Sequence, residues 1–152
     1  MSVEIRDEPA DGPAARALWA EYMALVASRL DHPVASPEAI FATTDAFGDG
    51  AWIVLYDGGE AVACGGLRRV DDTTGEIKRM FVSASARGRG HGRRLLAELE
   101  TRALATGLTR IGLITTEVLT EARDLYASAG YEVVATPREG TRQDYWMEKL
   151  LR

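Results

Sequence analysis

A segment rich in glycine and arginine, Arg87 to Arg94, contains the residue types that bind phosphate groups. It reads Arg-Gly-Arg-Gly-His-Gly-Arg-Arg and lies between a strand-like run and an amphipathic helix, and we call it the glycine loop. Its glycines permit positive φ angles and a close approach of the backbone to a ligand. The first N–H groups of the following helix have no partner inside that helix, and the helix dipole adds positive potential. The glycine loop therefore predicts a pyrophosphate-binding site.

The spacing of the glycines argues against three other motifs. A dinucleotide-binding fingerprint that starts at Gly88 requires a glycine at the position of Arg93. A P-loop requires Gly-Lys-Ser or Gly-Lys-Thr, which the segment lacks. Arginine- and glycine-rich segments that bind nucleic acids are usually repeated and disordered, whereas this one occurs once inside an expected folded unit.

Composition and charge indicate one folded domain that binds a small anion. The chain has 152 residues, of which 46% are apolar and 27% charged, so we expect a single domain over residues 1–152. Residues 78–94 contain six basic residues and no acidic one, which leaves a net charge of −11 on the remainder of a chain whose total is −5. A basic patch on an acidic body suits a small polyanion and a cationic co-substrate, and it disfavours a nucleic-acid partner.

The sequence offers no signal for a membrane or an oxidising compartment. No apolar stretch approaches the roughly 20 residues that cross a bilayer, and residues 1–8 do not resemble a signal peptide. The one cysteine, Cys64, lies in an apolar strand-like run, which favours a buried thiol. His32 and His91 lie in unrelated segments without metal-ligand spacing. We therefore expect a cytoplasmic monomer or homodimer with no metal and no membrane partner.

The pattern of apolar residues predicts a mixed α/β fold. Strands are expected at residues 3–6, 51–56, 60–69, 76–82, 110–115, 131–135 and 143–150, and helices at 13–26, 37–47, 90–106 and 120–129. The tight turns between residues 51 and 82 predict three antiparallel strands. Strand 76–82, helix 90–106 and strand 110–115 form a βαβ unit, whose two strands should be parallel.

Two motifs carry a resemblance to a known family. Arg87, Gly90 and Gly92 form the pattern Arg-x-x-Gly-x-Gly after the strand end Met80-Phe81-Val82, and residues 122–131 read Ala-Arg-Asp-Leu-Tyr-Ala-Ser-Ala-Gly-Tyr. The chain therefore resembles the GNAT superfamily of acetyl-CoA-dependent N-acetyltransferases over residues 76–131, whereas its N-terminal half agrees only in element order. It departs from the common pattern at Ala84, where many members have proline, and at Leu119, where many have asparagine.

The resemblance implies the GNAT acyl-CoA N-acyltransferase fold, a central twisted mixed sheet of six to seven strands flanked by about four helices. In that fold the sheet splays between strands 76–82 and 110–115, and the pantetheine arm of acetyl-CoA enters the gap. A free backbone N–H near Phe81 or Val82 would then stabilise the negative charge that develops on the thioester oxygen.

The resemblance also implies roles for single residues. Tyr126 would protonate the departing CoA thiolate, with a buried core tyrosine as the alternative. Glu76 would act as general base, directly or through water, with a structural pair to Lys78 as the alternative. Trp19, Tyr22 and Phe41 would line the acceptor pocket, or else belong to the core. His91 is expected in a loop at the mouth of the site, without an evident partner. The residues expected to bind acetyl-CoA are Met80, Phe81, Val82, Arg87, Gly88, Arg89, Gly90, His91, Gly92, Arg93, Thr115, Ala122 and Tyr126.

These observations predict an enzyme that transfers an acetyl group from acetyl-CoA to a primary amine of a small molecule or peptide, by direct attack in a ternary complex. An alternative is a non-catalytic acyl-CoA-binding sensor or regulatory domain, which would bind acetyl-CoA without turnover. A third is a nucleic-acid-binding module built on the basic patch. The acidic remainder of the chain and the absence of aromatic residues within the glycine loop argue against that third alternative.

Overall fold

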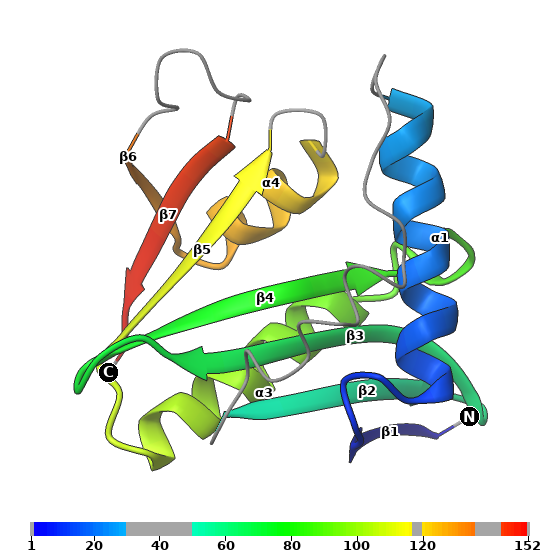
Figure 1. Ribbon diagram of the computed structural model, residues 1–152, viewed down its shortest axis with the longest axis horizontal. Helices are drawn as coiled ribbons and strands as arrows, with labels where there is room; N and C mark the ends of the chain where they lie inside the picture. The colour runs from blue at the N-terminus through cyan, green and yellow to red at the C-terminus, as the bar shows by residue number, and fades with distance from the viewer. Residues whose placement is uncertain (1, 30–49, 117–119, 136–143, 152) are drawn as a thin grey trace.

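Seven strands and three α-helices form the described part of the computed structural model, which comprises residues 2–29, 50–116, 120–135 and 144–151 (Figure 1). The expected helix 37–47 lies outside these residues. The elements in chain order are β1 (Val3–Asp7), α1 (Pro13–Arg29), β2 (Ala51–Asp57), β3 (Glu60–Arg69), β4 (Thr74–Val82), the short 3-10 helix η2 (Ala84–Ala86), α3 (His91–Ala105), β5 (Arg110–Thr116), α4 (Thr120–Ser128), β6 (Glu132–Ala135) and β7 (Asp144–Leu150).

One mixed sheet contains all seven strands, in the spatial order β1-β2-β3-β4-β5-β7-β6. The pairs from β1 to β4 are antiparallel, β4 and β5 are parallel, and β7 is antiparallel to both β5 and β6. The expected antiparallel meander and the parallel βαβ unit, with α3 as its crossover helix, are therefore confirmed. The expected mixed α/β fold is also confirmed, because the sheet has helices on both of its faces (Figure 1).

β4 and β5 separate after a short parallel contact. Their register runs only from the pair Thr74–Arg110 to the pair Ile77–Leu113, although β4 remains paired to β3 as far as Val82. Figure 1 shows the two strands diverging beyond this contact. A bulge interrupts β4 at the same point, because two of its residues, 79 and 80, face one residue of β3, and Arg79 has a φ of 57°. A bulge bends a strand and increases its twist, so it turns the end of β4 away from β5.

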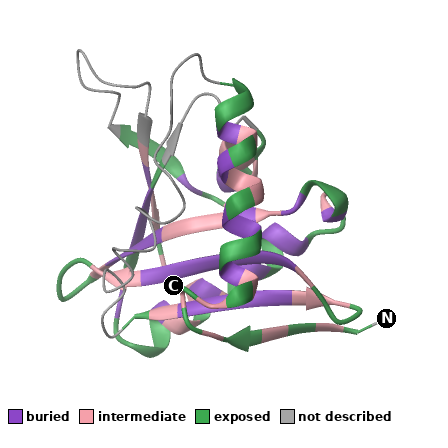
Figure 2. Cartoon of the chain, turned by 45° about the vertical axis from the view of Figure 1, so that its right-hand side comes forward, coloured by how far each residue is buried: buried purple, intermediate pink, exposed green. Residues whose placement is uncertain are grey.

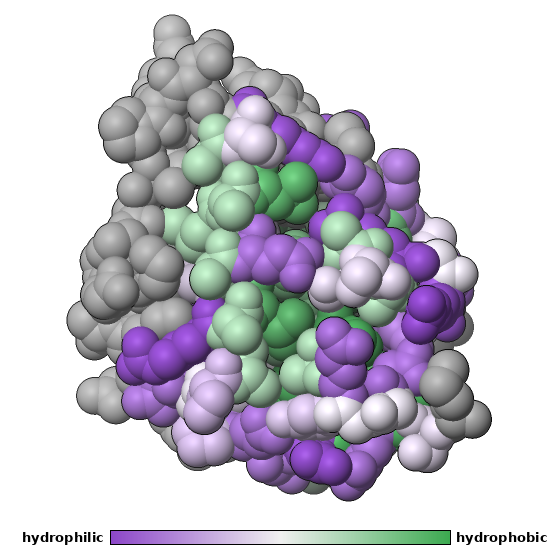
Figure 3. Space-filling view, turned by 90° about the vertical axis from the view of Figure 1, so that its right-hand side faces the viewer, coloured by the Kyte–Doolittle hydropathy of each residue, from purple (hydrophilic) through white to green (hydrophobic). Residues whose placement is uncertain are grey.

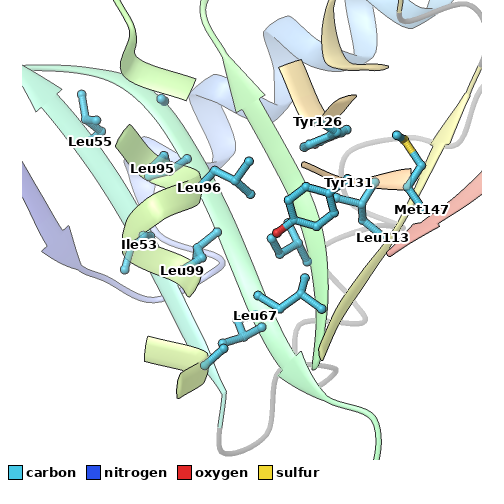
Figure 4. Packing of buried hydrophobic residues seen from close by; sticks show 14 of the residues in the cluster. Ile53, Leu55, Leu67, Leu95, Leu96, Leu99, Leu113, Tyr126, Tyr131 and Met147 are labelled. Atoms are coloured by element: carbon cyan, nitrogen blue, oxygen red, sulfur yellow. The ribbon is translucent and has the colours of Figure 1, made fainter. Parts of the chain in front are cut away.

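The strands β2 to β4 are buried between α3 on one face of the sheet and α1 on the other (Figure 2). Alternate residues of β2 belong to the two cores, since Ile53 and Leu55 pack under α3 whereas Trp52 and Val54 pack under α1. Figure 4 shows the larger core, in which Leu95, Leu96 and Leu99 of α3 are at most 1% exposed. Burial of each such leucine contributes roughly 1.5–3 kcal/mol, so this packing fixes α3, and with it the glycine loop, on the sheet.

Two further expectations from the sequence concern Cys64 and membrane-spanning segments. Cys64 is fully buried in the smaller core, as expected, and burial raises the pKa of its thiol to about 12. Among the helices that the structure describes, none has both the length and the apolar character that crossing a membrane requires.

Candidate active site

A pocket of about 400 Å³ lies between α1 and α4, beside the C-terminal end of β4. Figure 3 views the molecule from the side on which β4 ends and shows apolar surface in the centre of that face, with hydrophilic surface around it. A mostly apolar hollow with a few convergent polar groups is typical of small-molecule sites. The lining residues are Tyr22, Leu25, Met80, Phe81, Val82, Ala86, Arg87, Gly88, Gly90, His91, Gly92, Arg93, Glu121, Ala122, Leu125 and Tyr126.

The glycine loop supplies the polar end of the pocket. Gly88 and Gly90 have φ angles of 81° and 79°, and a Cβ at either position would meet no atom within 4 Å. Their backbone conformation therefore requires glycine, and the space beside them is open to a ligand. The first hydrogen bond within α3 runs from Arg94 N–H to Gly90 O at 3.0 Å, so the preceding N–H groups point out of the helix. This arrangement fits a phosphate group.

Gly92 is required for a different reason, the close packing of three elements. A Cβ at this position would lie 2.8 Å from Leu125 Cδ2 on α4 and 3.2 Å from Val82 Cγ2 on β4. The start of α3 therefore packs closely against both α4 and the end of β4. This contact holds the glycine loop at a fixed distance from α4.

The arginines of the glycine loop point in different directions. Arg87 lines the pocket, and its Nε donates to Val82 O at 3.2 Å. Arg93 also lines it, and its Nη2 donates to Ser128 Oγ at 2.6 Å. Arg89, which was expected at the site, lies outside the lining, and its Nη1 is 3.3 Å from Asp57 Oδ2. The structure thus brings two of the three expected arginines to the pocket.

The expectation that His91 is a loop residue without a partner is wrong. His91 is the first residue of α3 and only 5% exposed, and its Nε2 lies 2.9 Å from Asp57 Oδ2. The sequence could not reveal this contact, because it depends on the β2–β3 hairpin lying against the start of α3. His91 nevertheless lines the pocket, as expected.

Tyr126 of α4 lines the pocket and is 6% exposed. Its ring meets the Tyr131 ring edge to face, with a distance of 6.0 Å between centroids. Burial raises the pKa of Tyr126 well above its ordinary value, and the neighbouring Tyr22 raises it further. The phenol is therefore protonated at neutral pH, which is the form that donates a proton.

The aromatic residues of α1 divide between the pocket and the core. Tyr22 lines the pocket, stacks on Trp19 with 4.2 Å between ring centroids and meets the Phe81 ring edge to face. Trp19 does not line the pocket; it is 7% exposed and belongs to the core under α1. Phe41 lies outside the described residues. Of the two expected residues that the structure describes here, Tyr22 reaches the pocket and Trp19 does not.

Glu21 attaches α1 to the segment that follows β4. Its carboxylate accepts hydrogen bonds from Ser83 Oγ at 2.8 Å and from Ala84 N–H at 2.9 Å. Helix α1, which carries Tyr22, is therefore fixed relative to the end of β4.

Glu76 does not line the pocket. It is 7% exposed, and its Oε1 accepts a hydrogen bond from Arg68 Nε at 2.9 Å, so its ion pair is with Arg68 and not with Lys78. Arg68 is its cross-strand neighbour on β3. Since Ile77 packs in the core under α3, strand alternation places Glu76 on the sheet face that carries α1.

The end of β4 has an edge that no strand covers in the described part of the chain. Ser83 N–H donates to Val62 O on β3 at 2.8 Å, so the preceding residue, Val82, directs its N–H and C=O to the opposite edge. That edge faces the gap left by β5. Thr115, another expected site residue, lies on β5 beyond Leu113, the last residue paired with β4.

Four lining residues were not anticipated: Leu25, Ala86, Glu121 and Leu125. Two of them, Glu121 and Leu125, are four positions apart on α4 and therefore share one face of that helix. In the described part of the chain, no group of three or more His, Cys, Asp or Glu side chains is placed to hold a metal ion.

Known proteins resemble this chain in sequence and in fold. A family model described as Acetyltransferase (GNAT) family matches residues 15–131. The IAA acetyltransferase of Azospirillum brasilense is 36% identical over 102 residues, which span 66% of this chain and 66% of that protein. The uncharacterized N-acetyltransferase YjgM of Escherichia coli is 30% identical over 133 residues, or 84% of this chain and 78% of that protein. The structure of a GNAT family acetyltransferase from Elizabethkingia anophelis with acetyl-CoA bound shares the fold, with a TM-score of 0.72, 18% identity and 98% of both chains covered.

Proposed function

Because this chain belongs to the GNAT acetyltransferase family, we propose that it is an acetyl-CoA-dependent N-acetyltransferase that modifies a primary amine of a small molecule or peptide. One observation carries the proposal: a helix N-terminus suited to pyrophosphate and a buried, protonated tyrosine line the same pocket. The relatives named as acetyltransferases support the activity, and the Elizabethkingia anophelis protein binds acetyl-CoA within the same fold.

The pocket residues fit the parts of acetyl-CoA. The open side of Gly88 and Gly90 leaves room for the pyrophosphate, and the N–H groups at the start of α3 would donate to it. Arg87 and Arg93 would add positive charge there. Apolar side chains from β4, α1 and α4 would surround the pantetheine arm.

The reaction forms a bond between the amine nitrogen and the acetyl carbon and breaks the carbon–sulfur bond of the thioester. The Val82 N–H, on the uncovered edge of β4, would donate to the thioester oxygen as negative charge develops there. The phenol of Tyr126 would give its proton to the departing sulfur and regain one from solvent. Burial in the same pocket would also raise the pKa of the departing thiol, which would lower the cost of this proton transfer.

The amine must lose a proton in the same reaction. Glu76 is the proposed base, and because it does not line the pocket, this role requires an intervening water molecule. The products are then an N-acetylated amine and the free CoA thiol.

The experiment that tests the proposal is a calorimetric titration with acetyl-CoA, with S-acetyl pantetheine as the control ligand that lacks pyrophosphate. We expect saturable binding that depends on the phosphates, followed by thiol release in the presence of suitable amines. Binding without thiol release across a broad amine panel would instead support a non-catalytic sensor. Absence of acetyl-CoA binding would contradict both.

A further inference from the structure

The first residue of α3 carries a titratable side chain that the proposed reaction does not use. His91 lies between Gly90 and Gly92, is 5% exposed, and has its Nε2 at 2.9 Å from Asp57 Oδ2. Asp57 ends β2, and its side chain is only 10% exposed. An imidazole and a carboxylate are therefore buried together at the base of the glycine loop.

The charged groups around this pair come from every neighbouring element. Arg89 of the glycine loop approaches the same Asp57 oxygen at 3.3 Å, and its side chain is 56% exposed. Glu60 of β3 is opposite Asp57 in the hairpin and exposed. Arg87, Arg93 and Glu121 line the same pocket as His91, and Arg94 of α3 is exposed. Asp57 is the carboxylate that contacts His91 directly.

The contact positions the donors of the glycine loop. His91 is the N-terminal residue of the helix, so the direction of its backbone sets the direction of the adjacent N–H groups. The bond to Asp57 ties this residue to the β2–β3 hairpin, while Gly92 is held by its packing against Leu125. Loss of the bond would detach the start of α3 from the hairpin and leave its contacts with α4 and β4.

The contact also couples ligand binding to protonation of the His91–Asp57 pair. A pyrophosphate at the glycine loop would place negative charge close to the imidazole, and nearby negative charge favours the imidazolium form. Imidazolium also makes a stronger, charge-assisted bond to Asp57. Anion binding therefore favours proton uptake by the pair, and by linkage the protonated pair binds the anion more tightly.

On this basis we propose that His91 and Asp57 are a positioning pair for the glycine loop, which takes up a proton when the pyrophosphate of acetyl-CoA binds. The proposal rests on the proposed function, because it assumes that acetyl-CoA is the ligand. It adds to that function two residues that contact neither the thioester nor the amine. It also adds a dependence of cofactor affinity on pH. Affinity should fall as the pH rises through the range in which the pair loses its proton.

Calorimetric titrations in two buffers of different ionisation enthalpy measure the number of protons taken up on binding. The ligand is 3′-dephospho-acetyl-CoA, because the 3′-phosphate of acetyl-CoA titrates near pH 6 and would add its own protons. The variants are His91→Gln and Asp57→Asn, which retain a polar side chain of similar size. Glu60→Gln is the matched control, because it removes an exposed carboxylate from the same hairpin.

We expect the wild type and Glu60→Gln to take up protons on binding and His91→Gln to take up none. In both pair variants Kd and KM for the cofactor should rise about tenfold, the loss expected for one charge-assisted hydrogen bond, while kcat at saturation stays nearly unchanged. Unchanged proton uptake in His91→Gln overturns this inference alone. A parallel fall in kcat and thermal stability, with KM unaltered, also overturns it, since a merely structural role predicts that result. If the wild type binds no acetyl-CoA at all, the proposed function fails first.

Discussion

Arg29 near the end of α1 and Glu121 in the first turn of α4 form a bidentate ion pair, with Nη1–Oε2 and Nη2–Oε1 distances of 2.9 and 2.5 Å. The two residues are 92 positions apart in the sequence. The pair joins the two helices that form opposite walls of the pocket. Arg29 lowers the pKa of Glu121 to about 2.

This ion pair predicts part of the response of stability to acid. The unfolded chain protonates Glu121 near its ordinary pKa of 4.5, whereas the folded chain keeps the carboxylate charged down to about pH 2. The pair therefore stabilises the fold above pH 4.5, and this contribution is lost as the pH falls from 4.5 to 2. Glu121→Gln should flatten the dependence of the urea midpoint on pH in that window. Glu98→Gln, which removes a carboxylate paired within α3, is the control and should retain the wild-type slope.

Tyr126→Phe should lower kcat about 100-fold or more while leaving the affinity for acetyl-CoA nearly intact, because the change removes a proton donor and little packing. Steady-state kinetics and calorimetry on the same preparation measure the two effects. Tyr131→Phe is the matched control, since Tyr131 is buried beside Tyr126 but its hydroxyl donates to Glu100 Oε2 at 2.9 Å. It should lose stability and retain kcat. An unaltered kcat in Tyr126→Phe would show that sulfur leaves without this donor.

Gly90→Asp should abolish acetyl-CoA binding. The substitution forces a side chain into a position with φ of 79° and adds a negative charge where the phosphates would lie. Gly107→Asp, at the other end of α3, provides the control, because Gly107 has a φ of 85° and equally open space. Both variants should lose roughly 1–3 kcal/mol of stability from backbone strain. Equal acetyl-CoA affinities in the two variants, measured by calorimetry, would exclude the glycine loop as the phosphate site.

Glu76→Gln distinguishes a base from a structural ion pair. As a base, Glu76 would contribute a factor of about 100 or more to kcat, and steady-state kinetics of Glu76→Gln should show a loss of that size. Glu148→Gln is the control, because Glu148 also pairs with an arginine, Arg110. Glu148 on β7 and Glu76 on β4 are both paired with Gly112 of β5, which lies between them in the sheet. A similar, small loss of kcat in both variants would mean that Glu76 only balances the charge of Arg68.

The sequence was informative about features that depend on neighbouring residues. The period of the apolar residues predicted the strands and the order of the elements, and the glycines at 88, 90 and 92 predicted the turn into α3. Positive φ angles at Gly88 and Gly90 are properties of the local chain. The glycine loop also allowed most of the pocket lining near β4 and α3 to be predicted.

Partners from distant segments were beyond such reasoning. The contacts of His91 with Asp57 and of Arg29 with Glu121 join elements that approach each other only after the sheet has formed. Likewise, the sequence suggested Lys78 as a partner for Glu76, whereas the β3–β4 register places Arg68 there. Register depends on turn geometry and on the bulge at residues 79 and 80, neither of which composition determines.

The short contact between β4 and β5 divides the sheet into two half-sheets, one made of β1 to β4 and the other of β5, β7 and β6. The pocket takes residues from β4 in the first half and from α4, which lies between β5 and β6 of the second half in the chain. A ligand in the pocket would therefore bridge both halves. Each tenfold rise in its free concentration above Kd would stabilise the folded chain by about 1.4 kcal/mol. Part of that free energy would hold the half-sheets together, so the two halves would unfold more cooperatively with the ligand than without it.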